Sequence, residues 1–284
     1  MTHKTFLFAA LVGVLGWCCV GCESNEPSKT GGGSGTYVAK GFSVSANKQV
    51  VFSPGNLQYT QSTDTWAFAA KQYEMIGKAN INDDELADKI DLFGWSGNLG
   101  HAKWGISTSE DYDDYVGNFV DWGQNIGDGT SWRTLTNDEW TYLRETRANA
   151  SNLMGIARIN LDVEGTTYAN GLILLPDSWT CPEGITFKPG FASEYSIQAY
   201  ADYQTFTLEQ WQKLEASDAV FLPASGHRYG SSISLVQNSG YYWFATPFTF
   251  DSFYACCLLF LSNADFRYGD CRYYGRAVRL VQDL

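Results

Sequence analysis

The sequence predicts an α+β fold with mixed or antiparallel sheets, two capped helices and long irregular loops. Short alternating segments separated by turn residues fill the first part of the chain and predict strands, while two capping motifs further on predict helices. Two apolar runs, each followed by proline, add buried strands around the second motif. With 284 residues, 44% of them hydrophobic and 15% aromatic, the chain can bury a large core.

The first 36 residues are expected to direct and anchor the protein rather than to join the fold. The apolar run from Phe6 to Val20 is too short to span a bilayer and has the length of a signal-peptide core. It ends in Cys19-Val20-Gly21-Cys22, which resembles a bacterial lipobox, so residues 1–21 are predicted to be a signal peptide and Cys22 the lipidated residue. Residues 22–36 then form a flexible polar tether.

The first 36 residues predict the location of the protein, and the net charge limits its partners. Acidic residues close behind the lipidated cysteine resemble the surface-export signals of some Gram-negative lipoproteins. We therefore expect a protein held at the outer membrane by its lipid anchor alone and exposed at the cell surface. A periplasm-facing position and simple secretion are the alternatives. The net charge of −12 argues against nucleic acid or an anionic membrane surface as the main partner.

An antiparallel start made of short strands is predicted after the tether. Alternating segments at Phe42–Ser45 and Gln49–Phe52 are followed by turn residues at 53–56. Two further segments, Leu57–Tyr59 and Trp66–Phe68, complete this part of the chain. Neighbouring strands joined by such short turns pair most simply in an antiparallel way.

Residues 77–131 predict a long irregular region. The stretch is rich in glycine, asparagine and aspartate, which favour loops over regular elements. Disordered segments lack aromatic residues, so the tryptophans spaced along it indicate ordered loops that their own side chains pin to the domain. These are Trp95, Trp104, Trp122 and, directly after its end, Trp132.

Two capping boxes predict the two helices. Thr136 and Thr207 are the expected N-caps, and Glu139 and Gln210, three residues later, are placed to accept a hydrogen bond from the N-cap backbone. A tryptophan follows each box and a leucine comes three residues after it. Each helix therefore has one apolar face to pack against a sheet.

Two apolar runs predict core strands between and after these helices. Gly171–Leu175 precedes Pro176, and Ala219–Leu222 precedes Pro223. No change in composition separates these segments from the rest of the chain. Residues 37–284 are therefore predicted to form one domain.

The sequence holds no pattern typical of a catalytic or metal site. Only His101 and His227 remain after processing, and neither lies beside a nucleophile-elbow motif. The mature cysteines lack C-x-x-C spacing, and the acidic clusters at residues 83–85 and 110–114 do not follow the EF-hand pattern. We expect a protein that is not an enzyme and that requires no cofactor and no metal.

The segment from Gly240 to Val281 differs from the rest of the chain. It is dense in aromatic residues and cysteine and ends in an alternating strand pattern at Arg276–Leu280. Between Phe244 and Gly275 it has no Lys, Gln, Glu, Trp or Met, although these types make up 45 of the 243 residues before it, so that about six would be expected. No codon ending in a pyrimidine encodes any of these five types. Randomised adenines in asparagine codons would leave this signature, and chance is the alternative.

Two parts of the chain carry a family resemblance. Trp132–Leu143 looks like the R-L-P-T-x-x-E-W-E-Y segment of the formylglycine-generating-enzyme branch of the C-type-lectin fold. Gly240–Trp243 and Gly275–Val281 look like the C-terminal frame Y-W-S-S-T-P … R-x-x-G-x-S-V-R-L-V of related bacterial surface proteins. With the missing residue types, the chain resembles the variable protein of a diversity-generating retroelement, whose C-terminal repeat is rewritten by adenine-directed mutagenesis.

The resemblance implies a C-type-lectin-like domain at residues 37–284 with a variable region at 241–281. In that family the variable side chains project from a small sheet and its loops toward solvent, while a buried frame keeps the core. The implied frame residues are Trp243, Leu258, Phe260, Val278 and Leu280. The implied ligand-contacting residues are Phe244, Phe248, Phe250, Asp251, Phe253, Cys256, Cys257, Leu259, Leu261, Asp265, Phe266, Tyr268, Asp270, Cys271, Tyr273 and Tyr274.

The chain departs from two other branches of this fold. Cys256, Cys257 and Cys271 do not have the spacing of the copper-binding cysteines of the enzyme branch, and the E-P-N, Q-P-D and W-N-D motifs of calcium-dependent lectins are absent. The resemblance therefore implies a non-enzymatic binding protein whose partner is a protein or a glycan. A structural or adhesive subunit of a surface assembly, and a carbohydrate-binding module with aromatic platforms, are the alternatives.

Overall fold

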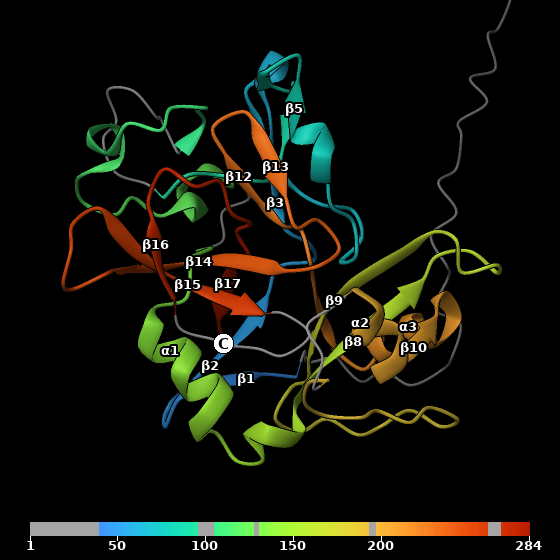
Figure 1. Cartoon of the computed structure of the whole chain (residues 1–284). Helices are drawn as coiled ribbons and strands as arrows, with labels where there is room; N and C mark the ends of the chain where they lie inside the picture. The colour runs from blue at the N-terminus through green and yellow to red at the C-terminus, as the bar shows by residue number, and fades with distance from the viewer. Residues whose placement is uncertain (1–39, 96–104, 128–130, 193–196, 261–267) are drawn as a thin grey trace, which may run out of the picture. The chain divides into compact units, whose positions relative to one another are not determined.

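The computed structural model describes residues 40–95, 105–127, 131–192, 197–260 and 268–284. These residues belong to one compact unit, Ala39–Leu284 (Figure 1). No helix in the described ranges combines the length and apolarity that crossing a membrane requires. The signal peptide, the tether with Cys22, and Trp104, Leu261, Asp265 and Phe266 lie outside the described residues.

The fold is α+β, as predicted, and strands dominate it. Several antiparallel sheets are present, together with a mixed four-stranded sheet in which β10 runs parallel to β8. The strands are β1 (Phe42–Ser45), β2 (Lys48–Phe52), β3 (Leu57–Thr60), β4 (Thr65–Phe68), β5 (Ile81–Asn82), β6 (Glu85–Leu86), β7 (Lys89–Ile90), β8 (Met154–Asn160), β9 (Tyr168–Leu174), β10 (Thr205–Thr207), β11 (Val220–Pro223), β12 (His227–Tyr229), β13 (Ser232–Ser234), β14 (Gly240–Pro247), β15 (Tyr254–Phe260), β16 (Tyr268–Cys271) and β17 (Val281–Asp283).

The N-terminal strands pair antiparallel, which confirms that prediction. β2 lies between β1 and β17, so the first and last strands of the unit share one sheet. β3 pairs with both β4 and β7. Phe42, Val44 and Val50 bury their side chains in the main core cluster, where they contact residues from the other sheets.

Both predicted capping boxes are present. The Thr136 hydroxyl accepts from the Glu139 N–H at 3.3 Å, and the Glu139 carboxylate accepts from the Thr136 N–H at 2.9 Å. Thr207 and Gln210 form the same reciprocal pair. The helical elements are α1 (Asn137–Thr141), α2 (Ile197–Tyr203), α3 (Leu208–Glu215), the π-helical turn η6 (Tyr142–Thr146), and the 3-10 turns η1 (Gln61–Thr63), η2 (Gly77–Asn80), η4 (Tyr112–Tyr115), η5 (Trp122–Asn125) and η7 (Ala150–Asn152).

The two predicted core strands are β9 and β11, which pair antiparallel within the sheet of order β10-β8-β9-β11. Trp211 and Leu214 of α3 are buried against Ile173 and Phe221 of this sheet. Figure 1 shows α2, α3 and this sheet at one end of the unit and β14, β15 and β16 at the other. The sequence did not predict α2 or β10.

The irregular region after β4 contains mainly short elements, as predicted for its described residues. Trp95 and Trp122 are fully buried. The Trp95 indole Nε1 donates to the Phe244 carbonyl at 2.9 Å. This region is therefore fixed against the C-terminal sheet.

The strand predicted at Arg276–Leu280 is wrong in its position. These residues form only isolated bridges, such as Tyr242 with Ala277, and the strand β17 begins at Val281. All of them are buried, including both arginines. The Arg276 guanidinium pairs with Asp270 and lies over the Tyr241 ring at 4.2 Å, so its charge is stabilised inside the protein. An alternating sequence pattern cannot distinguish such a buried arginine from an exposed one.

Candidate ligand-binding surface

The C-terminal sheet, β14-β15-β16, is buried on both faces. Its strands pair antiparallel, so side chains along β15 alternate between two core clusters. Cys257 packs with Trp243 in one cluster, and Leu258 and Phe260 pack with Phe244 in the other. Solvent therefore reaches mainly the ends of the strands and their connections, together with a few half-buried strand positions such as Cys256 and Leu259.

This packing confirms the frame and corrects part of the predicted binding face. All the implied frame residues are buried: Trp243, Leu258, Phe260, Val278 and Leu280. The expectation of exposed side chains is wrong for Phe244, Cys257, Asp270, Cys271 and Tyr273, which are buried too. The sheet has no open face for strand residues such as Phe244, whose ring stacks on Trp140 at 5.7 Å.

The exposed aromatic residues of the segment lie at the hairpin tip, residues 248–253, which joins β14 and β15. Phe250 is 89% exposed and Phe253 is 40% exposed, and the half-buried Phe248 packs edge-on against Phe250 at 5.7 Å. Asp251 shapes the turn, because its carboxylate accepts from the Phe253 N–H at 2.9 Å and its carbonyl accepts from the Tyr254 N–H at 3.2 Å. The tip therefore presents large apolar side chains on a hydrogen-bonded turn.

Next to the hairpin tip, aromatic side chains from three separate segments form one continuous row, the aromatic ridge. Phe253 contacts Tyr112 with ring centroids 5.0 Å apart, and Tyr112 contacts Tyr273 at 4.9 Å. Tyr229 then contacts Tyr273 at 5.7 Å and Tyr274 at 5.2 Å. Tyr112 and Tyr229 are each 41% exposed, so the ridge has a displayed outer edge.

Buried residues support the ridge from below. Tyr273 and Cys271 form a small cluster with the fully buried Tyr115, and the Tyr112 hydroxyl lies 4.0 Å from the Cys271 sulfur. Burial raises the pKa of Tyr273, which therefore stays a neutral phenol at physiological pH. The predicted contact residues Cys271 and Tyr273 thus position the exposed rings rather than form the surface themselves.

The half-buried His227 continues the ridge at its far end. Its imidazole stacks on the Tyr274 ring at 5.7 Å and meets the Tyr241 ring edge-on at 5.1 Å. Burial, with the nearby positive charge of Arg276, lowers the pKa of His227 to about 4. The histidine is therefore a neutral, aromatic part of the surface at neutral pH.

Acidic residues border the ridge. Glu110 and Asp111 are exposed and directly precede Tyr112. A hydrogen bond with Glu110 raises the pKa of Tyr229, which places this carboxylate at the phenol. In contrast, the arginines beneath the surface are buried. Arg272, for example, donates to the Tyr254 carbonyl at 3.1 Å, and its guanidinium lies over the Trp95 ring at 4.1 Å.

A surface groove of about 480 Å³ lies on the other side of the hairpin tip. Asp138 is the one charged residue among its lining side chains in the described part of the chain. Burial and the nearby Asp138 raise the pKa of the Cys256 thiol in this groove, so the thiol stays protonated. The groove is lined by Asn137, Asp138, Thr246, Pro247, Phe248, Thr249, Phe250, Cys256 and Gly269.

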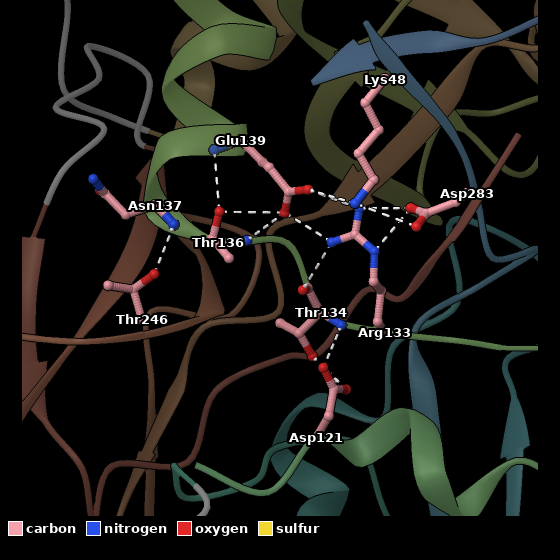
Figure 2. Close-up of polar contacts among 9 residues, drawn as sticks. All are labelled: Lys48, Asp121, Arg133, Thr134, Thr136, Asn137, Glu139, Thr246 and Asp283. Atoms are coloured by element: carbon pink, nitrogen blue, oxygen red, sulfur yellow. Dashed lines mark hydrogen bonds and ion pairs between the residues drawn. The ribbon is translucent and has the colours of Figure 1, made fainter. Parts of the chain in front are cut away.

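A polar network fixes the helix end that forms one wall of the groove (Figure 2). The Asn137 N–H donates to the Thr246 hydroxyl at 3.0 Å, which joins α1 to β14. Behind it, the Arg133 guanidinium bridges the Glu139 and Asp283 carboxylates, both at 2.7 Å. Burial opposes ionisation of Glu139, but the hydrogen bonds from Arg133 and the Thr136 backbone, together with the positive charges of Arg133 and Lys48, outweigh it and lower the pKa of Glu139.

The remaining predicted contact residues have mixed positions. Cys256, Leu259 and Tyr274 are half-buried, and Tyr268 begins β16. Sequence reasoning missed Tyr112, Tyr229 and the groove wall on α1. Tyr112 lies inside the acidic cluster at residues 110–114, where its position between carboxylates was the one available signal.

No protein-family model, curated protein or solved structure matches this chain. Within the described ranges, histidine, cysteine and carboxylate side chains do not gather in groups of three or more that could hold a metal ion. The case for function therefore depends on the surface itself.

Proposed function

We propose that this chain is a ligand-binding protein displayed at the bacterial surface on a lipid anchor. Its binding surface consists of the hairpin tip, the aromatic ridge and the groove beside the tip. We further propose that the domain has a C-type-lectin-like fold and that a diversity-generating retroelement varies the part of this surface that lies within residues 241–281. The ligand is a protein or a glycan, and the protein acts by binding rather than by catalysis.

One observation carries the proposal. Every exposed aromatic side chain in the described ranges belongs to the hairpin tip or the ridge: Tyr112, Tyr229, Phe250 and Phe253. Exposed apolar residues scattered singly are ordinary, whereas a gathering of large aromatic rings on a soluble domain marks an interaction site. Tyrosine and phenylalanine also provide large contact areas at low cost in side-chain entropy, which suits a binding surface.

The packing also supports a variable surface. Phe250 and Phe253 lie on the turn between β14 and β15, whose strands are mostly buried on both faces, while Tyr112 begins the 3-10 turn η4 and Tyr229 ends the short strand β12. Changes at exposed positions therefore leave the core contacts in place. The absence of Lys, Gln, Glu, Trp and Met between Phe244 and Gly275 is the sequence feature that points to the retroelement.

Selection from libraries tests the binding function. The purified full chain in detergent would be panned against phage-displayed peptides and applied to a glycan array. We expect ligands whose binding falls in Phe250→Ser and Tyr229→Ser but not in Val163→Ser, because Val163 is 99% exposed on the β8–β9 connection and serves as the matched apolar control. Equal loss in all three variants, or none in the first two, would contradict the proposal.

The neighbouring DNA tests the retroelement separately. We expect a near-copy of the 3′ coding segment, with adenines at the positions that differ, beside a reverse-transcriptase gene. If the flanking DNA has neither, diversification is excluded, and the surface becomes a fixed binding or adhesive site.

A further inference from the structure

We infer that the partner of this surface is a protein segment rich in lysine or arginine, and that the groove beside the hairpin tip receives one of its cationic side chains. This inference rests on the proposed binding function and adds the chemistry of the partner. It depends on the charges around the aromatic rings, on the lining of the groove and on the position of the protein's own cations.

Among the residues that the structure describes, the charges that reach solvent near the ridge are negative. Glu110 and Asp111 are exposed on the connection that carries Tyr112, and Glu110 hydrogen-bonds with Tyr229. Asp251 lies in the hairpin tip between Phe250 and Phe253. A cation bound where a carboxylate lies beside an aromatic ring is stabilised in two ways. The carboxylate forms an ion pair with it, and the quadrupole of the ring attracts it.

The arginines of this region are buried, and only Arg272 acts on one of these carboxylates, because its charge interacts with that of the half-buried Asp251. The Arg228 guanidinium donates to the backbone carbonyls of Gly230 at 3.4 Å and Gly105 at 3.5 Å. Arg272 is bonded to the Tyr254 carbonyl, and Arg276 is paired with the buried Asp270. In the described ranges, the charges that an approaching partner meets around the ridge are therefore mainly acidic.

The groove has the composition of a pocket for one cationic side chain. The Phe248 and Phe250 rings line one part of it, and the exposed carboxylate of Asp138 lies in another. The Asn137 amide donates to the Asp138 carboxylate at 3.3 Å, which orients it. A lysine or arginine stem can lie along the phenylalanine rings while its charged end reaches Asp138.

The net charge of the whole chain also favours a basic partner. A net charge of −12 attracts basic proteins over a distance and repels acidic proteins and acidic glycans. This general attraction brings a basic partner near any part of the protein. The aromatic rings and the groove then decide where it binds.

Fluorescence anisotropy with labelled hexalysine, hexaarginine and hexaglutamate tests the inference on the full chain in non-ionic detergent. The two basic peptides are expected to bind, and Asp138→Asn and Phe250→Ser are each expected to weaken that binding about fivefold. Glu183→Gln is the matched control, because it removes one exposed carboxylate from the loop that packs on the four-stranded sheet. Thermal melts would verify that all three variants are folded.

The outcomes separate this inference from the proposed function. Basic peptides that lose affinity in Asp138→Asn but not in Glu183→Gln support it. Equal affinities in both variants overturn it, because binding then reflects the net charge alone. If hexalysine and hexaarginine do not bind while library-selected ligands still depend on Phe250, the inference fails and the proposed function stands. If neither kind of ligand depends on Phe250, both fail.

Discussion

Trp243 and Phe250 belong to the same β-hairpin but have opposite surroundings. Trp243 is 1% exposed, and its indole Nε1 donates to the Phe93 carbonyl at 2.7 Å, whereas Phe250 is 89% exposed at the tip. Trp243→Ala should lower the free energy of unfolding by roughly 3–5 kcal/mol, and Phe250→Ser should change it within about ±0.5 kcal/mol. Urea unfolding of the full chain measures both. A comparable loss in the two variants would mean that the hairpin tip belongs to the core.

His227 gives the ridge a predictable response to pH. Burial lowers the pKa of His227 to about 4, from 6.5 in the unfolded chain, so between these values the unfolded state binds more protons than the folded state. The stability that His227 contributes is therefore full above pH 6.5 and is lost as the pH falls toward 4. Because the side chain is partly exposed, we expect a loss of about 1–2 kcal/mol.

The measurement for His227 is a difference between two titrations. Carboxylates also change charge in this pH range, so unfolding free energies would be compared between the wild type and His227→Gln. The difference between them should grow from pH 4 to 6.5 in favour of the wild type and then stay level. A difference that is constant with pH would show that His227 titrates alike in the folded and unfolded states.

At the scale of elements, the two capping boxes have different surroundings although their sequences are alike. Gln210 bonds the backbone of Thr207 at an exposed helix start, whereas Glu139 also pairs with Arg133 and with Lys48, at 3.3 Å, in a half-buried network. Gln210→Ala should therefore cost about 1 kcal/mol, and Glu139→Ala about 3 kcal/mol, because it leaves Arg133 with one carboxylate partner fewer. Chemical unfolding of the two variants tests this, and equal costs would show that the network adds nothing to the cap.

The elements that were predicted correctly are those with local signals. The capping boxes, the turn-bounded strands at Phe42–Ser45 and Leu57–Thr60, and the apolar runs of β9 and β11 each depend on residues close together in the chain. The position of β17 depends instead on distant pairing. Arg279 enters the core because a partner far along the chain, Gln72 at 2.5 Å, receives its guanidinium group. Arg276 enters it by pairing with Asp270 and lying over the Tyr241 ring. No pattern within residues 276–280 contains that information.

At the scale of the whole molecule, the sequence located the segment that carries the candidate site but not its exposed residues. The aromatic residues of the segment look alike in sequence, yet Phe244 is buried by a sheet packed on both faces while Phe250 lies on a turn. The sequence did not predict that Tyr112 and Tyr229 belong to the candidate surface, because they contact Tyr273 only in the folded chain. A binding surface assembled from three segments is a property of tertiary structure.

In the complete domain, the exposed aromatic residues and the buried ones should differ sharply in what their removal costs. Replacing Tyr112, Tyr229, Phe250 and Phe253 together by serine should cost no more than about 3 kcal/mol, because only exposed ring contacts are lost. The matched control replaces four buried residues by serine: Phe244, Cys257, Cys271 and Tyr273. That variant should lose most or all of its stability, since truncating its two buried aromatic residues costs roughly 3–5 kcal/mol each, the two buried cysteines are lost as well, and domains are stable by about 5–15 kcal/mol.

Circular dichroism melts of the two quadruple variants test whether the exposed rings are needed for the fold. Binding to library-selected ligands would be measured in parallel. We expect the first variant to melt cooperatively but to lose binding, and the second to show no cooperative transition. If the first variant also unfolds, the exposed rings hold the C-terminal segment together, and changes on this surface cannot be independent of the fold. Since a diversified protein must keep its fold while its surface changes, that result would remove the physical basis of the proposed diversification.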